Sequence, residues 1–377
     1  MTSRRPLGWL AITSITALAV VGCAGGAAPT VAPTAPPTLT ASPTASETPE
    51  PTDSATPTHQ PSPTGTPAAT ATVSPTDTPA PSDSPSATAT AGPTATPAGA
   101  SPVIQVGTGP IGITATEDAI WVATFYDGEL VRIDPETMTV TDNVAVGDGA
   151  IGVAYAAGSL WVATHLTGEL VRVDPETREV TARIEVGAEP EGVCGDDSQI
   201  WVTSEAAGGA IRIDPETNEI VTSVAVGRAP RHCGVGFDSV WVTNWGSATM
   251  TRIDSESNEV VETIGLHFGP EGVAFTDTGV WVANQTAGSV SLVDPETNEE
   301  TAEIQIGMLP EGIAIGDDGL VWAATTQLDH IEAIDPESEE IVATLETGNE
   351  PRRIVIVDGQ AWVTNTGGGT VSVIPLD

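Results

Sequence analysis

A tryptophan recurs about every 40 residues along most of this chain, and no other sequence feature constrains the fold as strongly. Seven of them form a series spaced by 40, 40, 40, 40, 41 and 40 residues: Trp121, Trp161, Trp201, Trp241, Trp281, Trp322 and Trp362. Each stands in a short alternating segment such as Ile120–Thr124, and this period of two predicts a β-strand. The regular spacing therefore predicts seven copies of one structural unit, with the tryptophans in its core.

One repeat, followed from end to end, contains four strand-like segments separated by turn residues. They cover residues 272–275, 280–283, 289–293 and 300–306. Four short antiparallel strands in 40 residues are typical of a β-propeller blade, whereas a β-solenoid needs shorter coils and parallel pairing. We therefore expect an all-β fold, a seven-bladed β-propeller of four-stranded antiparallel blades over residues 102–377.

The two ends of the repeat region complement each other. The last repeat stops after three strands, and Pro102–Gly107 resembles the fourth strand of the other repeats. We expect this N-terminal strand to join the last blade and to close the ring, because closure removes the exposed strand edges of an open array.

The first 23 residues resemble a bacterial lipoprotein precursor. Arg4 and Arg5 precede an uncharged apolar stretch, 7–21, and small residues then lead to Cys23. The resemblance implies a signal peptide at 1–22, a lipidated N-terminus at 23–26 with Cys23 as the anchor, and an extracytoplasmic protein held on the cell membrane. An uncleaved membrane helix is the alternative, although the stretch is shorter than the roughly 20 residues needed to span a bilayer. The arginine pair leaves a twin-arginine export route open.

Residues 27–101 consist mainly of Pro, Thr, Ser and Ala. Such a segment buries too little apolar surface to offset the entropy lost on ordering, so we predict a disordered stalk. Its density of Thr and Ser also suits O-glycosylation, which is an inference from composition alone.

Charge and cysteine content exclude several classes of function. The net charge is -39, and all 12 cationic side chains are Arg. This balance disfavours nucleic-acid partners, because a phosphate backbone requires a basic surface. Three cysteines cannot form a zinc ribbon or a disulfide-rich scaffold. The sequence also lacks a Gly-rich phosphate loop and a nucleophile elbow.

The repeats resemble the YVTN family of β-propellers over residues 102–377. Val240–Asn244 and Ala361–Asn365 stand close to the Tyr-Val-Thr-Asn signature of that family, and Thr370–Ile374 and Gly269–Val273 match its neighbouring segments. The resemblance implies the propeller fold, and it implies recognition or scaffolding more than catalysis. The function must therefore be argued from a site and not from the fold.

The loops on the two opposite faces of the ring, which we call its two ends, differ in how uniform their sequences are. On one end the Asp-Pro-Glu-Thr turns between the third and fourth strands repeat almost unchanged, which indicates a structural role. On the other end the residues differ from blade to blade, and charged side chains are predicted to surround the channel mouth. The binding candidates there are Glu191, Arg231, His232, Trp245, Glu271, Glu311 and Arg352. Mixed charges beside aromatic surface suit a small polar or zwitterionic ligand, or a protein partner. The alternative is that these charges pair across blades and seal the ring.

A more distant resemblance connects the chain with the streptogramin lyase-like propellers. That resemblance implies a His on one blade and a Glu-x-His pair on the next, near magnesium. Glu271 matches the Glu, but Val273 replaces the following His, and Arg231 stands where the other His is expected, with His232 displaced by one position. We therefore assign no catalytic residue and no cofactor. A divalent metal on His232, His267 and Glu271, serving a lyase or hydrolase, is the competing hypothesis.

Cys194 and Cys233 lie on the first strands of adjacent blades, at positions that differ by one. Their side chains therefore lie on opposite sheet faces, and neighbouring blades pack front to back. The pair either meets in the shared interface, where an oxidising compartment would favour a disulfide, or points away from it on both sides.

Overall fold

The computed structural model describes residues 102–376. The predicted signal peptide, lipidated cysteine and stalk lie outside these residues. Within the described range, no helix is long and apolar enough to cross a bilayer.

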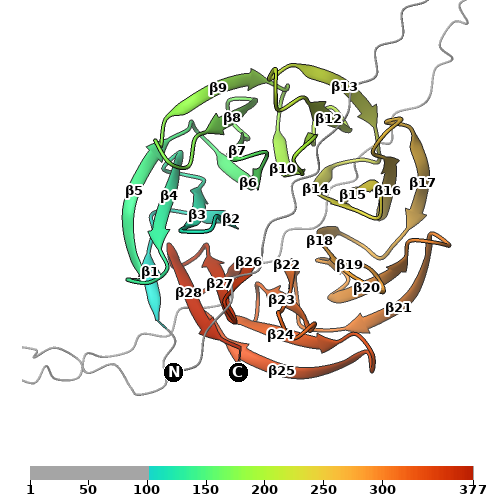
Figure 1. The fold of residues 1–377 in the computed structure, drawn as a ribbon. Helices are drawn as coiled ribbons and strands as arrows, with labels where there is room; N and C mark the ends of the chain where they lie inside the picture. Colours follow the sequence, from blue (N-terminus) through green and yellow to red (C-terminus); the bar gives the residue numbers. More distant parts are fainter. Residues whose placement is uncertain (1–101, 377) are drawn as a thin grey trace, which may run out of the picture. The chain divides into compact units, whose positions relative to one another are not determined.

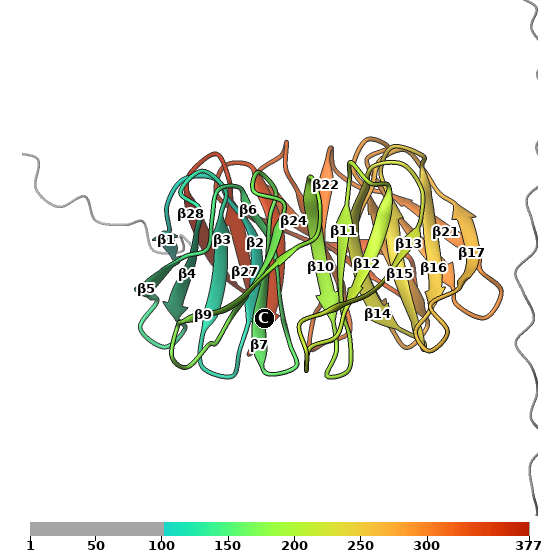
Figure 2. The ribbon, with the colours of Figure 1, turned by 90° about the horizontal axis from the view of Figure 1, so that it is seen from above.

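The described residues form seven four-stranded antiparallel sheets arranged in a ring, which confirms the predicted seven-bladed β-propeller. Figure 1 shows one strand of each sheet beside the central channel and another at the perimeter. Seen from the side in Figure 2, the strands run between two opposite ends of the ring, where the turns lie.

The strands fall into four groups by their place in the blade. The innermost strands are β2 (Pro110–Ala115), β6 (Ala150–Ala156), β10 (Pro190–Gly195), β14 (Pro230–Gly236), β18 (Pro270–Thr276), β22 (Pro310–Ile315) and β26 (Pro351–Val357). The second strands are β3 (Ile120–Thr124), β7 (Ser159–Thr164), β11 (Ile200–Ser204), β15 (Ser239–Asn244), β19 (Gly279–Asn284), β23 (Val321–Thr325) and β27 (Gln360–Asn365). The third strands are β4 (Glu129–Asp134), β8 (Glu169–Val173), β12 (Gly209–Ile213), β16 (Thr249–Asp254), β20 (Ser289–Asp294), β24 (His330–Asp335) and β28 (Thr370–Pro375). The outer strands are β5 (Thr139–Ala145), β9 (Val180–Glu185), β13 (Ile220–Ala225), β17 (Val260–Gly265), β21 (Glu299–Gln305), β25 (Glu340–Glu346) and β1 (Val103–Gln105).

The seventh blade is built from both ends of the described chain. Its strand order is β1-β28-β27-β26, and β1 pairs antiparallel with β28 through Val103 and Ser372. Ile104 and the following Val106 are buried against Trp362 and its neighbours. The predicted closure by the N-terminal strand is therefore confirmed.

The periodic tryptophans are core residues, because all seven side chains are at most 2% exposed. Two of them also support an arginine from the third strand. The Arg172 guanidinium lies 4.8 Å from the ring centre of Trp161, and its Nη1 donates to the Pro215 carbonyl (2.7 Å) of the next blade. Arg252 lies over Trp241 at 4.7 Å in the same way. These repeated arginines tie one blade to the next and are not available as ligand contacts.

The Asp-Pro-Glu-Thr turns are held by their own aspartates. In the first of them, Asp134 Oδ1 accepts hydrogen bonds from the backbone N–H groups of Glu136 (2.9 Å) and Thr137 (3.0 Å). Those hydrogen bonds hold the pKa of Asp134 below its usual range. The same aspartate-to-backbone bonds recur at Asp174, Asp214, Asp254, Asp294 and Asp335. This end of the ring is uniform because one turn structure is used repeatedly.

Candidate functional site at the channel mouth

The variable end of the ring comprises the turns between the second and third strands and the connections that lead to the innermost strands. In each blade the first residue after the second strand donates its backbone N–H to the connection. Phe125 donates to the Gly109 carbonyl (2.9 Å) and His165 to the Gly149 carbonyl (2.8 Å). These bonds fold the variable turns toward the mouth of the channel.

A concave mouth pocket of about 340 Å³ opens on this end. Residues of five blades line it: Ile111, Phe125, Tyr126, Ile151, His165, Glu191, Glu205, Arg231, Arg352 and Thr366. The volume lies within the usual range for small-molecule sites. Of the seven binding candidates from the sequence, Glu191, Arg231 and Arg352 line this pocket.

Glu191 forms the centre of a charged cluster in the pocket wall. Its Oε1 lies 2.7 Å from Arg231 Nη1 and its Oε2 lies 3.0 Å from His165 Nδ1, while Arg231 also contacts Glu205 at 3.2 Å. Burial alone would raise the pKa of Glu191, but the His165 and Arg231 partners outweigh it and hold that pKa below its usual range. The close Glu191 carboxylate in turn raises the pKa of His165. The cluster therefore favours an ionised Glu191 and a protonated His165.

A second charged group links blades six and seven. Arg352 Nε lies 3.2 Å from Glu311 Oε2, and Glu311 Oε1 accepts a hydrogen bond from Gln285 Nε2 at 2.8 Å. Gln285 also accepts from the indole N–H of Trp245 (2.9 Å), whose ring faces Arg231 at 5.6 Å. Glu311 is buried, whereas one third of the Arg352 side chain is exposed. Trp245 contacts Arg231 through its ring face and is not among the residues that line the mouth pocket.

Glu271 lies deeper and is bound to Arg353. Arg353 Nη2 donates to Glu271 Oε1 (2.8 Å), a pairing that skips the sixth blade, and its Nη1 donates to the Glu311 carbonyl (3.1 Å). Burial raises the pKa of Glu271, and the nearby Glu311 carboxylate adds to this rise while the Arg353 charge opposes it. The pairing of charges across blades, which the sequence left as an alternative, is thus present beneath an open pocket.

His232 borders the channel below the mouth. A β-bulge between Pro230 and Cys233 interrupts the alternation of side chains, so His232 reaches the channel although it directly follows Arg231. Together with Arg353 it lines a cavity of about 30 Å³, large enough for water. Its Nδ1 is shielded from solvent and has no hydrogen-bond partner within residues 102–376. Burial, and secondly the charge of Arg353, lower the pKa of His232 to about 3.

Three members of these clusters, His165, Glu205 and Gln285, are on the variable end of the sequence repeats but are not among the seven binding candidates. All three follow a rule that the sequence does contain. The residue after a second strand contacts the mouth residue 26 positions later, on the next blade, as in His165–Glu191, Glu205–Arg231 and Gln285–Glu311. Arg353, which the sequence also places at the channel mouth, occupies a position at which most of the repeats carry glycine.

The structure does not bring together the hypothetical metal ligands. His267 contacts Glu300 and Glu303 of the outer strand β21 (3.2 Å each), away from the channel that His232 borders. The structure therefore gives no support to a metal held jointly by His232, His267 and Glu271, because His267 lies on a connection at the blade perimeter. No group of three potential metal-ligating side chains is found in the part of the chain that the structure describes.

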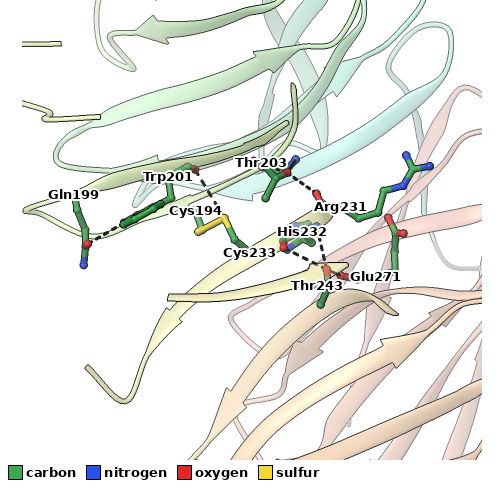
Figure 3. Close-up of a disulfide and its surroundings, with 10 residues drawn as sticks. Cys194, Gln199, Trp201, Thr203, Arg231, His232, Cys233, Thr243 and Glu271 are labelled. Atoms are coloured by element: carbon green, nitrogen blue, oxygen red, sulfur yellow. Dashed lines mark hydrogen bonds between the residues drawn. A yellow bond between two sulfur atoms is a disulfide. The ribbon is translucent and has the colours of Figure 1, made fainter. Parts of the chain in front are cut away.

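The two cysteines of the ring are joined. Cys194 on β10 and Cys233 on β14 form a disulfide between the third and fourth blades, with their Cα atoms 5.6 Å apart (Figure 3). Both side chains are buried beside Trp201. Of the two arrangements that the sequence left open, the structure has the one in which the side chains meet.

Comparison with known proteins supports the fold. No family model matches the sequence, and no curated protein matches it either. Among solved structures, a streptogramin B lyase has a TM-score of 0.64 at 17% identity and covers 72% of this chain and 94% of its own. A catalytically inactive virginiamycin B lyase from Staphylococcus aureus with quinupristin scores 0.65 at 16% identity, covering 73% and 99%. Hydrazine synthase of Kuenenia stuttgartiensis scores 0.64 at 18% identity, covering 71% and 96%.

At these identities the likeness shows a shared propeller architecture and no shared activity. It supports the predicted resemblance to the streptogramin lyase-like propellers at the level of fold. Membership of the YVTN family stays a prediction from the repeats.

Proposed function

We propose that this protein is a membrane-anchored, extracytoplasmic binding module that captures a small polar ligand in the mouth pocket. The observation that carries the proposal is the composition of the pocket. It gathers both signs of charge and an aromatic pair, Phe125 and Tyr126, from blades whose other end is uniform. A few oriented polar groups beside apolar surface are typical of ligand sites.

The hydrogen-bond donors that the mouth pocket leaves available to a ligand belong to a cationic side chain, Arg352. Within residues 102–376, the only ion-pair contact of Arg352 is from Nε to Glu311, and its two Nη groups donate no hydrogen bond to protein. A guanidinium presented in this way matches a carboxylate, which it can bind through two parallel hydrogen bonds. We therefore expect ligands that carry a carboxylate and an apolar or aromatic part.

Ligand-detected NMR with the purified full-length protein tests the binding role. Phenylalanine and phenylpropionate are the probes, and phenethylamine, which lacks the carboxylate, is the matched control. We expect binding of the two carboxylates and its loss in Arg352→Ala. Thermal melting of Arg231→Ala and Arg352→Ala separates binding from sealing. If these charges only seal the ring, the variants should melt at a lower temperature and the wild type should bind neither carboxylate probe.

The anchor and location belong to the same proposal and rest on the lipoprotein-like N-terminus. Mass spectrometry of the mature protein would detect a diacylglycerol on Cys23, and Cys23→Ala should release the protein from the membrane fraction. A protein that stays membrane-bound in the variant would contradict the lipid anchor.

The competing hypothesis is a lyase or hydrolase of the streptogramin lyase-like type. The similarity to the two lyase structures favours it. Incubating the protein with quinupristin, with and without magnesium, would test this activity directly. Cleavage of quinupristin would replace the binding proposal with an enzymatic one.

A further inference from the structure

The mouth pocket does not end at the rim of the channel. A second concavity of about 560 Å³, the outer groove, runs along the variable end of the second blade and is lined by the turn after β7, the start of β8 and the end of β9. His165 lines both the mouth pocket and the outer groove. The two concavities therefore meet at one side chain.

The outer groove is lined by acidic side chains, whereas the unpaired hydrogen-bond donors of the mouth pocket are cationic. Glu169, Glu185 and Glu189 line it. Glu169 is already paired with Arg183 at 3.0 Å. Glu185 and Glu189 are exposed, and neither forms an ion pair within residues 102–376. Two carboxylates without an ion-pair partner among the described residues thus lie beyond the mouth pocket, in which the unpaired donors belong to Arg352.

We propose that the mouth pocket and the outer groove are two subsites of one extended site, and that the site binds the C-terminal end of a basic peptide. This inference rests on the proposed function of the mouth pocket. The terminal carboxylate binds the Nη groups of Arg352, an apolar last side chain packs on Phe125 and Tyr126, and a preceding Arg or Lys lies against Glu185 and Glu189. Leu166, which is 65% exposed beside the junction, adds apolar surface.

A ligand that carries both charges uses both subsites, because each subsite offers the charge that the other lacks. Glu191 and Glu205 in the mouth already contact Arg231 and His165, so they offer little to a ligand cation. A simple carboxylate would leave the groove carboxylates unpaired. A chain end with a basic residue before it satisfies both subsites at once.

Fluorescence anisotropy with three N-terminally labelled peptides tests the inference on the full-length protein. The peptides are Gly-Ser-Arg-Gly-Phe with a free carboxylate, its C-terminal amide, and Gly-Ser-Gln-Gly-Phe with a free carboxylate. We expect the first to bind about tenfold more tightly than the second and severalfold more tightly than the third, at low salt.

Variants assign these preferences to the two subsites. Arg352→Gln should remove the preference for the free carboxylate, and the double variant Glu185→Gln with Glu189→Gln should remove only the preference for Arg over Gln. Both glutamates are exposed, so this double variant keeps its fold. Glu216→Gln with Glu256→Gln, on the uniform end, is the matched control and should change neither preference.

The possible failures are distinguishable. Equal binding of acid and amide peptides overturns the extended site. Binding of phenylalanine that depends on Arg352, combined with no dependence of peptide binding on Glu185 and Glu189, overturns the extended site but keeps the proposed function. Absence of both kinds of binding overturns the inference and the proposed function together.

Discussion

At the scale of single residues, two blades carry a large side chain at a position where the other five have glycine, and both side chains border the channel. In blades one, two, three, five and six the second residue of the bulge is Gly, and there the next blade approaches closely. A β-carbon on Gly152 would lie 2.2 Å from the Glu191 carbonyl oxygen, so this contact requires glycine. His232 and Arg353 occupy the same position in blades four and seven, and both border the channel cavity.

The low pKa of His232 makes folding stability depend on pH. In the folded protein the imidazole stays neutral down to about pH 3, whereas in the unfolded chain it binds a proton near its ordinary pKa of about 6.5. The unfolded state therefore binds more protons between these values, and stability is lost as pH falls through that window. At pH 4.5 this loss should reach about 2 to 3 kcal/mol relative to pH 8.

Urea unfolding of the wild type and of His232→Gln across pH 8 to 4.5 measures this effect. We expect the acid-induced loss of unfolding free energy to be smaller in the variant by that amount. His267→Gln controls for the removal of a histidine outside the channel. Parallel pH profiles for wild type and His232→Gln would show that His232 is protonated in the folded state.

At the scale of elements, a threonine hydroxyl connects neighbouring blades. Thr203 Oγ1 accepts a hydrogen bond from the Gly192 N–H (2.8 Å) and donates one to the Arg231 carbonyl (2.9 Å) of the next blade. Thr243 repeats the arrangement with His232 and Glu271 (Figure 3). These hydroxyls hold the start of an innermost strand, and hence the mouth residues, against the adjacent blade.

Replacing Thr203 with Val tests this connection, because valine has nearly the same shape and no hydroxyl. The change leaves a buried N–H and a partly buried carbonyl without that partner, so we expect a loss of about 1 to 3 kcal/mol in the free energy of unfolding. Thr344→Val, on the exposed outer strand β25, is the control and should change stability little. Equal stability of the two variants would contradict the role of the hydroxyl.

The disulfide is the covalent form of the same connection. Cys194 and Cys233 are 39 residues apart in sequence and join two adjacent innermost strands. A loop of this length, once closed, reduces the entropy of the unfolded chain by the equivalent of about 4 kcal/mol in the chain-entropy treatment. The double variant Cys194→Ala with Cys233→Ala should therefore unfold at lower urea concentration. Dithiothreitol should lower the midpoint of the wild type and leave that of the variant unchanged; an equal midpoint in all four samples would contradict this.

An element of the structure could be predicted from the sequence when the residues that form it recur from blade to blade. The strands, the closing β1 and the Asp134-type turns follow from periodicity, because each is fixed by contacts that recur in other blades. The mouth cluster could be predicted only in part. Its partners, such as His165 and Glu191, belong to different blades, and no other blade has a His at the position of His165. Likewise the bulge before Cys233 overrides simple strand alternation, and it decides that His232 lines the channel.

At the scale of the whole molecule, the ring is closed by a very short strand. β1 has three residues, yet Ile104 and the adjacent Val106 are buried in the core of the joint between blades seven and one. Thr364 Oγ1 adds a hydrogen bond across the same joint to the Ile111 carbonyl (2.8 Å). Truncation at either end should therefore damage the same blade.

Deleting residues 102–106 tests the contribution of β1. Loss of two buried aliphatic side chains should lower the free energy of unfolding by about 3 to 5 kcal/mol, and the uncovered edge of β28 should promote aggregation. Deletion of five residues from the predicted stalk, such as 70–74, is the control. Unchanged melting after the first deletion would mean that three strands are enough for the seventh blade.

The pairing of β1 with β28 also sets the order of events during biosynthesis. The first strand of the ring leaves the ribosome well before its partner exists, and at ordinary rates of synthesis the wait is on the order of tens of seconds. Throughout that interval six blades can form, but the joint between the seventh and the first stays open. The mouth pocket takes residues from both sides of this joint. A nascent or prematurely terminated chain could therefore complete most of the sheets and still have no binding site.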